Sequence, residues 1–496
     1  MLKRVLKKTA IFIVVLTITS TILYWFFGLT ILISGSGAVR LGFVKSSERR
    51  ANDVERHRAT QRASLPPVSA PSLPPAVVAD ATNPAGASAS VPAAPMAAAP
   101  DPRSYWTDFR GPARDGRYRE MPILTAWPAD GLKPVWKQPV GGGYASFVVA
   151  HGRAFTIEQR RTKEVVAAYD VVTGRELWTH SWDALFEEIM GGDGPRATPT
   201  WFDGRVYALG ATGELECLED DTGRVLWRKN ILEDNGASNL QWGMSAAPLI
   251  VDDTVIVLPG APGGRSIVAY DRRTGERTWS AQNDQQAYSS PMLVTLADTR
   301  QLVLLTATRL VGLSPNKGEL LWEYPWVTQM GINASQPVVV SDSRVFVSSS
   351  YGVGAALVEI SRQRDKFSVR EVWRNTRMKN KFTSSVLHEG YLYGLDESIL
   401  TCLDAATGDA KWKGGRYGYG QIVLASGHII VLTEDGDLAL VRATPAKYEE
   451  MARFHALDGK TWNHPALADG YLLVRNLQEM AAFDLRVRTT ASGRRP

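Results

Sequence analysis

The chain has 496 residues, of which 44% are hydrophobic and 22% are charged. A chain of this length and composition can bury a large core, which excludes disorder over its full length. The formal net charge of +5 suggests nucleic-acid binding. However, residues 1–62 alone carry a charge of +8, so the rest of the chain carries −3. A mildly acidic body on a basic stem lacks the charge pattern of a protein that binds phosphate backbones, so we expect no nucleic-acid partner.

The N-terminal region predicts a membrane anchor. No charged residue occurs between positions 9 and 39, and Ala10–Ile33 is almost continuously apolar. As a helix rising ~1.5 Å per residue, this apolar stretch would span roughly 36 Å, enough to cross a hydrocarbon core. A cleaved signal peptide, the alternative, has a shorter apolar region of about 7–15 residues. We therefore expect a basic cytoplasmic tail over 1–8 and an uncleaved transmembrane helix over 9–39.

Basic residues flank both ends of this anchor, so charge alone does not fix its orientation. Four of them fall within the first eight residues, and the bulk of the chain follows the anchor, which favours a cytoplasmic N-terminus. The expected location is the inner membrane, single-pass, with the body in the periplasm. A charged juxtamembrane segment over 40–63 and a Pro/Ala-rich segment over 64–102 lead to that body. The composition of 64–102 predicts a disordered, extended tether.

One phrase recurs through the rest of the chain. Its clearest copies read Asp-x-x-Thr-Gly-x-x-x-Trp, as in YDVVTGRELW, and its tryptophans recur at intervals of 39 to 52 residues. We interpret the Asp as the start of a turn, the Gly as a residue with positive φ, and the Trp as a bridge between neighbouring sheets. The repeat residues are Trp178, Trp227, Trp279, Trp322, Trp373 and Trp412, with Gly174, Gly223, Gly275, Gly318 and Gly408.

The repeat predicts an all-β, eight-bladed β-propeller of four-stranded blades. A second hairpin signature precedes each phrase, for example PTWFDGRVYALG at 199–210, which gives four strands per unit. Units of this length are typical of propeller blades, and eight of them fit within 103–487. The eighth unit lacks an outer strand, which we expect the segment around Trp136 to supply so that the ring closes. A disordered tail is expected over 488–496.

The phrase resembles the repeat of the pyrroloquinoline quinone (PQQ) family of eight-bladed propellers. That family contains quinoprotein alcohol dehydrogenases and the non-enzymatic outer-membrane assembly factor BamB. The stretches YWTDFRGPARDG at 105–116 and SSSYGVGAALVEI at 348–360 look like its PQQ-binding-like subgroup. The resemblance covers roughly residues 105–487 and implies the fold. It does not choose between members with and without a cofactor, because fold does not determine function.

Two cysteines occupy equivalent positions in the repeat. Cys217 and Cys402 each lie ten residues before a repeat tryptophan, in blades two and six. Blades four apart face each other across the ring, so the Cα atoms cannot approach within the roughly 7 Å that a disulfide needs. We expect two buried free thiols. The dehydrogenases of the methanol-oxidising type carry adjacent, bonded cysteines against the quinone, and this sequence contains no such pair.

The loops before the innermost strands should form the rim of a central funnel. They offer cationic and aromatic side chains toward one axis, a set that suits a flat polycarboxylated ligand or an acidic peptide. The alternative is that these groups only form hydrogen bonds inside a wet channel. The candidate ligand-binding residues are Tyr144, Arg196, Trp242, Tyr288, Asn333, Lys381, Tyr419 and His464.

A working quinoprotein also needs a Ca²⁺ site of carboxylate and amide oxygens and an Asp as the catalytic base. The rim segments contain Asn333 and Asn463 but no acid. Asp193 and Asp284 lie just outside them, two blades apart. We therefore predict no metal site, assign no catalytic residue or cofactor, and favour a BamB-like envelope scaffold with protein partners. The alternative is a membrane-anchored alcohol or sugar dehydrogenase that uses PQQ and Ca²⁺ in the funnel.

Overall fold

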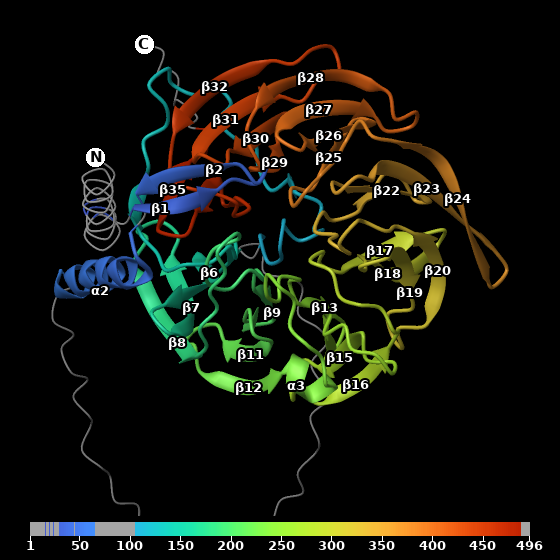
Figure 1. Cartoon of the computed structure of the whole chain (residues 1–496), viewed down its shortest axis with the longest axis horizontal. Coiled ribbons are helices and arrows are strands. Elements are labelled where there is room, and N and C mark those ends of the chain that lie inside the picture. Colours follow the sequence, from blue (N-terminus) through green and yellow to red (C-terminus); the bar gives the residue numbers. More distant parts are fainter. Residues whose placement is uncertain are drawn as a thin grey trace, which may run out of the picture.

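The structure, a computed structural model of the full chain, describes residues 29–43, 45–64 and 105–487, with three single positions before residue 29. Over 105–487, eight sheets stand around one axis as the blades of a propeller (Figure 1). Innermost strands of neighbouring blades contact one another around that axis, as β5 (Val148–Ala150) does with β9 (Thr200–Phe202) and with β33 (Ala466–Ala468). The predicted all-β, eight-bladed fold is confirmed.

The first four blades follow each other along the chain. Blade one contains β5 (Val148–Ala150), β6 (Arg153–Arg160), β7 (Lys163–Asp170) and β8 (Glu176–Asp183). Blade two contains β9 (Thr200–Phe202), β10 (Arg205–Leu209), β11 (Glu214–Glu219) and β12 (Val225–Asn230), followed by the short helix α3 (Ile231–Asn235). Blade three contains β13 (Leu249–Val251), β14 (Thr254–Val257), β15 (Ile267–Asp271) and β16 (Arg277–Ala281). Blade four contains β17 (Met292–Leu296), β18 (Thr299–Leu305), β19 (Arg309–Leu313) and β20 (Leu320–Pro325).

The last four blades continue the same order. Blade five contains β21 (Val338–Val339), β22 (Arg344–Ser349), β23 (Gly354–Gln363) and β24 (Lys366–Asn375). Blade six contains β25 (Val386–His388), β26 (Tyr391–Asp396), β27 (Ile399–Asp404) and β28 (Ala410–Arg416). Blade seven contains β29 (Gln421–Ala425), β30 (His428–Leu432), β31 (Asp437–Arg442) and β32 (Glu450–His455). Blade eight contains β33 (Ala466–Ala468), β34 (Tyr471–Arg475) and β35 (Glu479–Asp484).

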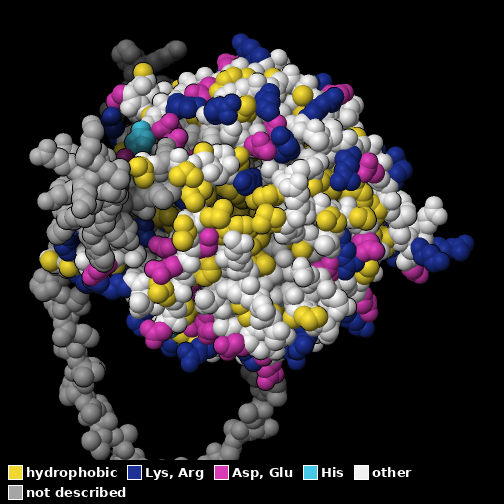
Figure 2. Space-filling view, in the orientation of Figure 1, with side chains coloured by type: hydrophobic (Ala, Val, Ile, Leu, Met, Phe, Trp, Pro, Cys, Tyr) yellow, Lys and Arg dark blue, Asp and Glu magenta, His cyan; other side chains and the backbone are white. Residues whose placement is uncertain are grey.

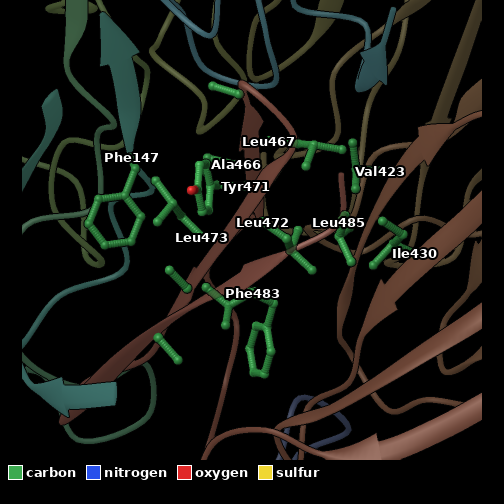
Figure 3. Close-up of a cluster of buried hydrophobic side chains, with 14 of the residues drawn as sticks. Phe147, Val423, Ile430, Ala466, Leu467, Tyr471, Leu472, Leu473, Phe483 and Leu485 are labelled. Carbon is green, nitrogen blue, oxygen red and sulfur yellow. The ribbon is translucent and has the colours of Figure 1, made fainter. Parts of the chain in front are cut away.

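The ring is closed by a strand from the other end of the propeller. β4 (Trp136–Pro139) pairs antiparallel with β35, with Trp136 opposite Ala482. The prediction that the segment around Trp136 completes blade eight is confirmed. A buried apolar cluster spans the junction of blades seven, eight and one, and includes Phe147, Ile430 and Phe483 (Figure 3). Closure therefore joins the two ends of the propeller by both strand pairing and packing.

Most of the repeat tryptophans pack against the turn of the next blade, whereas the indole N–H of Trp322 donates to Gln301 of its own blade. The indole N–H of Trp178 donates a 2.8 Å hydrogen bond to the backbone oxygen of Asp220. Gly223, in the same turn, has φ of +71°, and a Cβ there would lie 2.4 Å from the Trp178 ring. The glycine is thus required by the turn and by the seam between blades. The same contact joins Gly174 to Trp136, Gly275 to Trp227, Gly318 to Trp279 and Gly408 to Trp373.

The two cysteines lie where the repeat places them. Cys217 and Cys402 are buried and free, and each stands opposite the tryptophan of its own blade in the strand ladder. Burial raises the pKa of the Cys217 thiol to about 11 and that of Cys402 to about 12. The prediction of two buried free thiols is confirmed.

The chain before the propeller differs from the prediction. β1 (Leu29–Ile33) and β2 (Val39–Phe43) form an antiparallel hairpin, so the helix predicted over 9–39 is wrong from residue 29 onward. The intervening Ser-Gly-Ser-Gly stretch favours a turn over a helix, and Gly37 has φ of +83°. Within the described residues, no helix is both long and apolar enough to cross a membrane. Positions 1–14 and most of 15–28 lie outside the described residues, and there the anchor stays a prediction.

The segment predicted as charged and juxtamembrane, 40–63, is mostly a helix that packs on the propeller. α2 (Ser47–Ala63) lies against blade one and β4 (Figure 1). The buried Arg58 donates to the Glu176 carboxylate at 3.2 Å and to the Pro139 carbonyl at 3.0 Å. The residues just before the predicted tether therefore already contact the propeller. Of 64–102 only Ser64 is described, and the predicted tail over 488–496 lies outside the described residues.

Candidate functional site

The axis of the ring is crossed by the segment that precedes blade one, residues 105–116, drawn in cyan in Figure 1. Its backbone oxygens accept hydrogen bonds from innermost strands: Trp106 from Val149 in β5, and Thr107 from Trp201 in β9. It continues into β3 (Arg117–Tyr118), which pairs in parallel with β29 as a fifth strand of blade seven. The central channel therefore carries a plug made by the chain itself.

Two buried arginines fix this plug. Arg114 pairs with Asp108 at 3.0 Å and donates to the carbonyl oxygens of Pro248 and Pro291, at the starts of blades three and four. Arg110 donates to the carbonyl oxygen of Ser385 in blade six at 2.9 Å. Burial lowers the pKa of Arg110 to about 10, which leaves it charged at neutral pH. One short segment thus binds blades on opposite sides of the ring.

Several of the predicted funnel residues meet on the rim. Tyr144 precedes β5 and stacks on Trp462, which precedes β33, with 5.3 Å between ring centroids. The Arg196 guanidinium lies 5.7 Å from the centroid of the Tyr144 ring. The Lys460 ammonium lies 4.1 Å from the centroid of the Trp462 ring. Burial lowers the pKa of Lys460 to about 8. On this part of the rim, two stacked aromatic rings therefore lie between two cations, each within cation–π distance of a ring.

A second group of rim residues adjoins the first. The Lys381 ammonium lies 5.1 Å from the centroid of the Tyr419 ring. Phe382 contacts Trp462 with ring centroids 4.8 Å apart, so the two groups are continuous. The Glu434 carboxylate accepts a 3.0 Å hydrogen bond from the indole N–H of Trp462. Hydrophobic side chains gather across the centre of this face (Figure 2).

The remaining predicted residues divide into two kinds. Trp242 and Tyr288, which precede β13 and β17, contact each other on the rim with ring centroids 5.6 Å apart. Asn333 is fully buried, and its side-chain nitrogen donates to the carbonyl oxygens of Thr306 and Ala307 inside the wall of the ring. His464 is buried against Phe109 of the plug, and burial lowers its pKa to about 3. Asn333 and His464 therefore hold the scaffold rather than face the funnel.

Asp193 and Asp284, the acids that the sequence places just outside the rim segments, are both bound by arginines. Asp193 pairs with Arg50 of α2 at 3.0 Å. Asp284 pairs with Arg309 of β19 through both carboxylate oxygens, each at 2.7 Å. Within the described residues, no group of three or more His, Cys, Asp or Glu side chains is placed to hold a metal ion. The side chains present do not fit a Ca²⁺–quinone centre, whose ion needs several carboxylate and amide oxygens directed at one point.

Four rim residues were not among those predicted from the sequence, namely Phe382, Trp462, Lys460 and Glu434. Phe382 and Trp462 stand in the predicted rim segments, next to or near the residues that were chosen there. Lys460 lies four residues before His464. Glu434 comes from the turn between β30 and β31, which carries no rim signature in the repeat. Its position could not be found from the spacing of the innermost strands.

Comparison with known proteins gives the family. The family model described as "Outer membrane protein assembly factor BamB" matches residues 161–414, which is half of the chain. The chain belongs to this family. It is 26% identical over 308 residues to the outer membrane protein assembly factor BamB of Bordetella pertussis, covering 60% of this chain and 72% of that protein.

Relatives of a second kind share the propeller. The quinohemoprotein alcohol dehydrogenase of Comamonas testosteroni is 33% identical over 123 residues, which cover 23% of this chain and 16% of the enzyme. Its crystal structure aligns with a TM-score of 0.54 at 15% identity, over 79% of this chain and 82% of the enzyme. The structure of BamB from Moraxella catarrhalis aligns with a TM-score of 0.51 at 15% identity, over 72% of this chain and 99% of that protein. At these identities the structural likeness shows the fold alone.

Proposed function

We propose that this protein is a membrane-anchored, periplasmic binding scaffold of the cell envelope, in which the funnel rim binds a partner protein. The family and its BamB relatives support a scaffold. The observation that carries the proposal is the pairing of Asp193 with Arg50 and of Asp284 with Arg309. These pairs engage the two acids that the sequence places nearest the rim segments, and the rim around Arg196, Trp242 and Tyr288 offers cationic and aromatic side chains to a protein surface.

The chemistry of the rim supports a protein partner with acidic or carbonyl-rich segments. Arg196 and Lys460 lie over aromatic rings, an arrangement that lets a cation remain charged while partly shielded from water. Aromatic and arginine side chains are the groups that most often dominate the energy of protein interfaces. The rim therefore offers anchors for apolar contact and for anion binding.

The membrane anchor is part of the proposal. The apolar sequence over 9–28 supports a span through the inner membrane, and the basic residues at 3–8 support a cytoplasmic N-terminus. The described hairpin and α2 then lie between the anchor and the propeller. A topology test with a periplasm-specific labelling reagent on a single cysteine introduced at Ser36 would place the hairpin on one side of the membrane.

Crosslinking from the rim tests the partner directly. The photo-reactive residue benzoylphenylalanine replaces Trp242 in the full chain, in intact cells. The control places it instead at Phe202, the last residue of β9, away from the loops that form the rim. We expect an adduct with one envelope protein from position 242, reduced at least tenfold by Arg196→Met. No adduct from position 242, or the same adduct from position 202, would overturn the rim as the binding surface.

The second candidate is a quinoprotein dehydrogenase, favoured by the likeness to the enzyme of Comamonas testosteroni. That likeness covers 16% of the enzyme's length, and a shared propeller fold does not determine what its members bind. The arginine-bound acids do not fit the metal that such an enzyme needs. We therefore place this candidate second and give it its own test at the end of the Discussion.

A further inference from the structure

The turn of the β1–β2 hairpin sits on the funnel rim. Gly35, the second residue after β1, is buried, and its backbone N–H donates a 2.6 Å hydrogen bond to the Glu434 carboxylate. The backbone oxygen of the same residue accepts a hydrogen bond from the Lys381 ammonium. The hairpin runs across this face of the ring toward its centre (Figure 1). Both polar groups of one residue are thus held by charged side chains of the rim.

The two glycines of this turn are required for different reasons. A Cβ on Gly35 would lie 2.3 Å from the Tyr419 ring, which no real contact permits, although its backbone conformation suits any residue. Gly37 is the reverse case, because its φ is +83° and nothing lies within 4 Å of a Cβ there. Gly37 therefore serves the turn, whereas Gly35 serves only the close approach to Tyr419.

The groups that hold Gly35 are oriented by other contacts. The Glu434 carboxylate also accepts from the backbone N–H of Tyr419 at 3.3 Å and from the indole N–H of Trp462. The Lys381 ammonium lies between the rings of Tyr419 and Tyr351, 5.1 Å and 5.4 Å from their centroids. A carboxylate aimed at a peptide N–H and an ammonium aimed at its carbonyl form charge-assisted hydrogen bonds, which are stronger than neutral ones.

We propose that Lys381, Tyr419 and Glu434 form a binding site for a glycine in a peptide turn, and that Gly35 of the same chain is its resident occupant. The ring of Tyr419 selects glycine by leaving no room for a side chain, and the two charges bind the peptide groups on either side. The hairpin is then an internal ligand that any partner entering this part of the rim must displace. This inference holds whether or not the proposed envelope partner is found.

The first test uses hydrogen–deuterium exchange on the full chain in detergent. We compare wild type with Gly35→Leu, and with Gly37→Asn as the matched control, because asparagine tolerates positive φ and has free space at that position. We expect exchange across residues 34–38 to accelerate at least tenfold in Gly35→Leu and to change less than threefold in Gly37→Asn. Equal exchange in Gly35→Leu and wild type would overturn the proposal.

The second test asks whether the emptied site takes a turn from outside. The probe is a cyclic peptide of residues 32–40, added to Gly35→Leu protein and followed by fluorescence polarisation. We expect the peptide to bind Gly35→Leu at least tenfold more tightly than wild type, whose site is occupied. Binding should be lost in Gly35→Leu combined with Glu434→Ala, and in a peptide whose glycine at position 35 is alanine. Tight binding that survives both changes would contradict a glycine-specific site.

Discussion

The contacts that form the wall of the ring differ in kind from those at the ends of its central channel. In the wall, one contact repeats: a tryptophan of one blade packs on the glycine turn of the next, at Trp178 and Gly223 as at Trp227 and Gly275. The side chains of the plug and of the rim do not follow this pattern. Arg110 and Arg114 of the plug bind backbone oxygens of blades three, four and six, and on the rim Tyr144 stacks on Trp462.

The repeated contacts of the wall stabilise the propeller fold, whereas the side chains at the ends of the channel distinguish this protein from other propellers. A repeated contact stabilises each seam in the same way and carries no information about a ligand. The residues at the channel are free of that constraint, so their aromatic and cationic character can reflect a binding task. Four substitutions test this division: one in the plug, one at a seam between blades, one on the rim at Lys460 and one at Asp193, where α2 contacts the propeller.

The plug should show the largest effect. Arg114→Ala leaves the partly buried Asp108 carboxylate and several buried carbonyl oxygens without their donor, and we expect it to lower the free energy of unfolding by about 3–5 kcal/mol. The measurement is chemical denaturation of the full chain. The control is Arg119→Ala, which removes an exposed pair with Asp115 and should cost no more than about 1 kcal/mol. Equal losses in the two variants would mean that the buried contacts of the plug stabilise the ring no more than an exposed ion pair does.

A seam should show the next largest effect. Gly223→Ala forces an alanine into positive φ and into the Trp178 ring, and we expect a loss of about 2–4 kcal/mol in the free energy of unfolding. Gly204→Ala is the matched control, because Gly204 has φ of +72° and nothing within 4 Å of a Cβ. It should cost only the backbone strain, about 1 kcal/mol. Thermal unfolding of both variants measures the difference. An equal loss would mean that the contact between Gly223 and the Trp178 ring does not contribute to stability.

On the rim, Lys460 should give a pH dependence. Burial lowers its pKa to about 8, below that of a free lysine. The nearby Arg196 lowers the pKa as well, whereas the carboxylates of Glu434, Glu188 and Asp193 oppose the shift. The folded protein therefore binds fewer protons than the unfolded chain from about pH 8 to about 10.5. We expect Lys460→Met to be more stable than wild type by about 1 kcal/mol at pH 7, with the difference shrinking as pH rises through this window. A difference that stays constant from pH 7 to 10 would contradict a buried, charged amine.

The smallest effect is expected at Asp193. Asp193→Asn weakens the ion pair with Arg50 that helps to hold α2, and we expect a loss of no more than about 1 kcal/mol in the free energy of unfolding. Crosslinking from position 242 should be unchanged. Loss of that crosslink with stability intact would mean that Asp193 acts in binding rather than in docking α2.

What could be predicted from the sequence follows the same division. The repeat identifies the eight blades, the role of Gly223, the burial of Cys217 and the closing strand at Trp136, because each is read from its place in a period. The hairpin, the plug and the role of Glu434 do not repeat. Gly35 and Glu434 are 399 residues apart in the chain, and no local pattern links them.

The rim predictions show the same limit within a single set. Position in the loop before an innermost strand identified Tyr144 and Arg196, which do meet. The same rule selected Asn333, whose side chain turns into the wall because the carbonyl oxygens of Thr306 and Ala307 accept its N–H groups. Spacing places a residue in a loop, but the neighbouring backbone decides which way its side chain points.

Quinone binding is the measurement that tests the central claim most directly. The full chain in detergent is titrated with PQQ, with and without Ca²⁺, while quinone fluorescence and thermal stability are followed. We predict no saturable, Ca²⁺-dependent binding and no stabilisation, because Asp193 and Asp284 are held by arginines. Saturable binding that requires Ca²⁺, raises the melting temperature and is lost in Asp193→Asn or Asp284→Asn would contradict the scaffold and establish a quinoprotein.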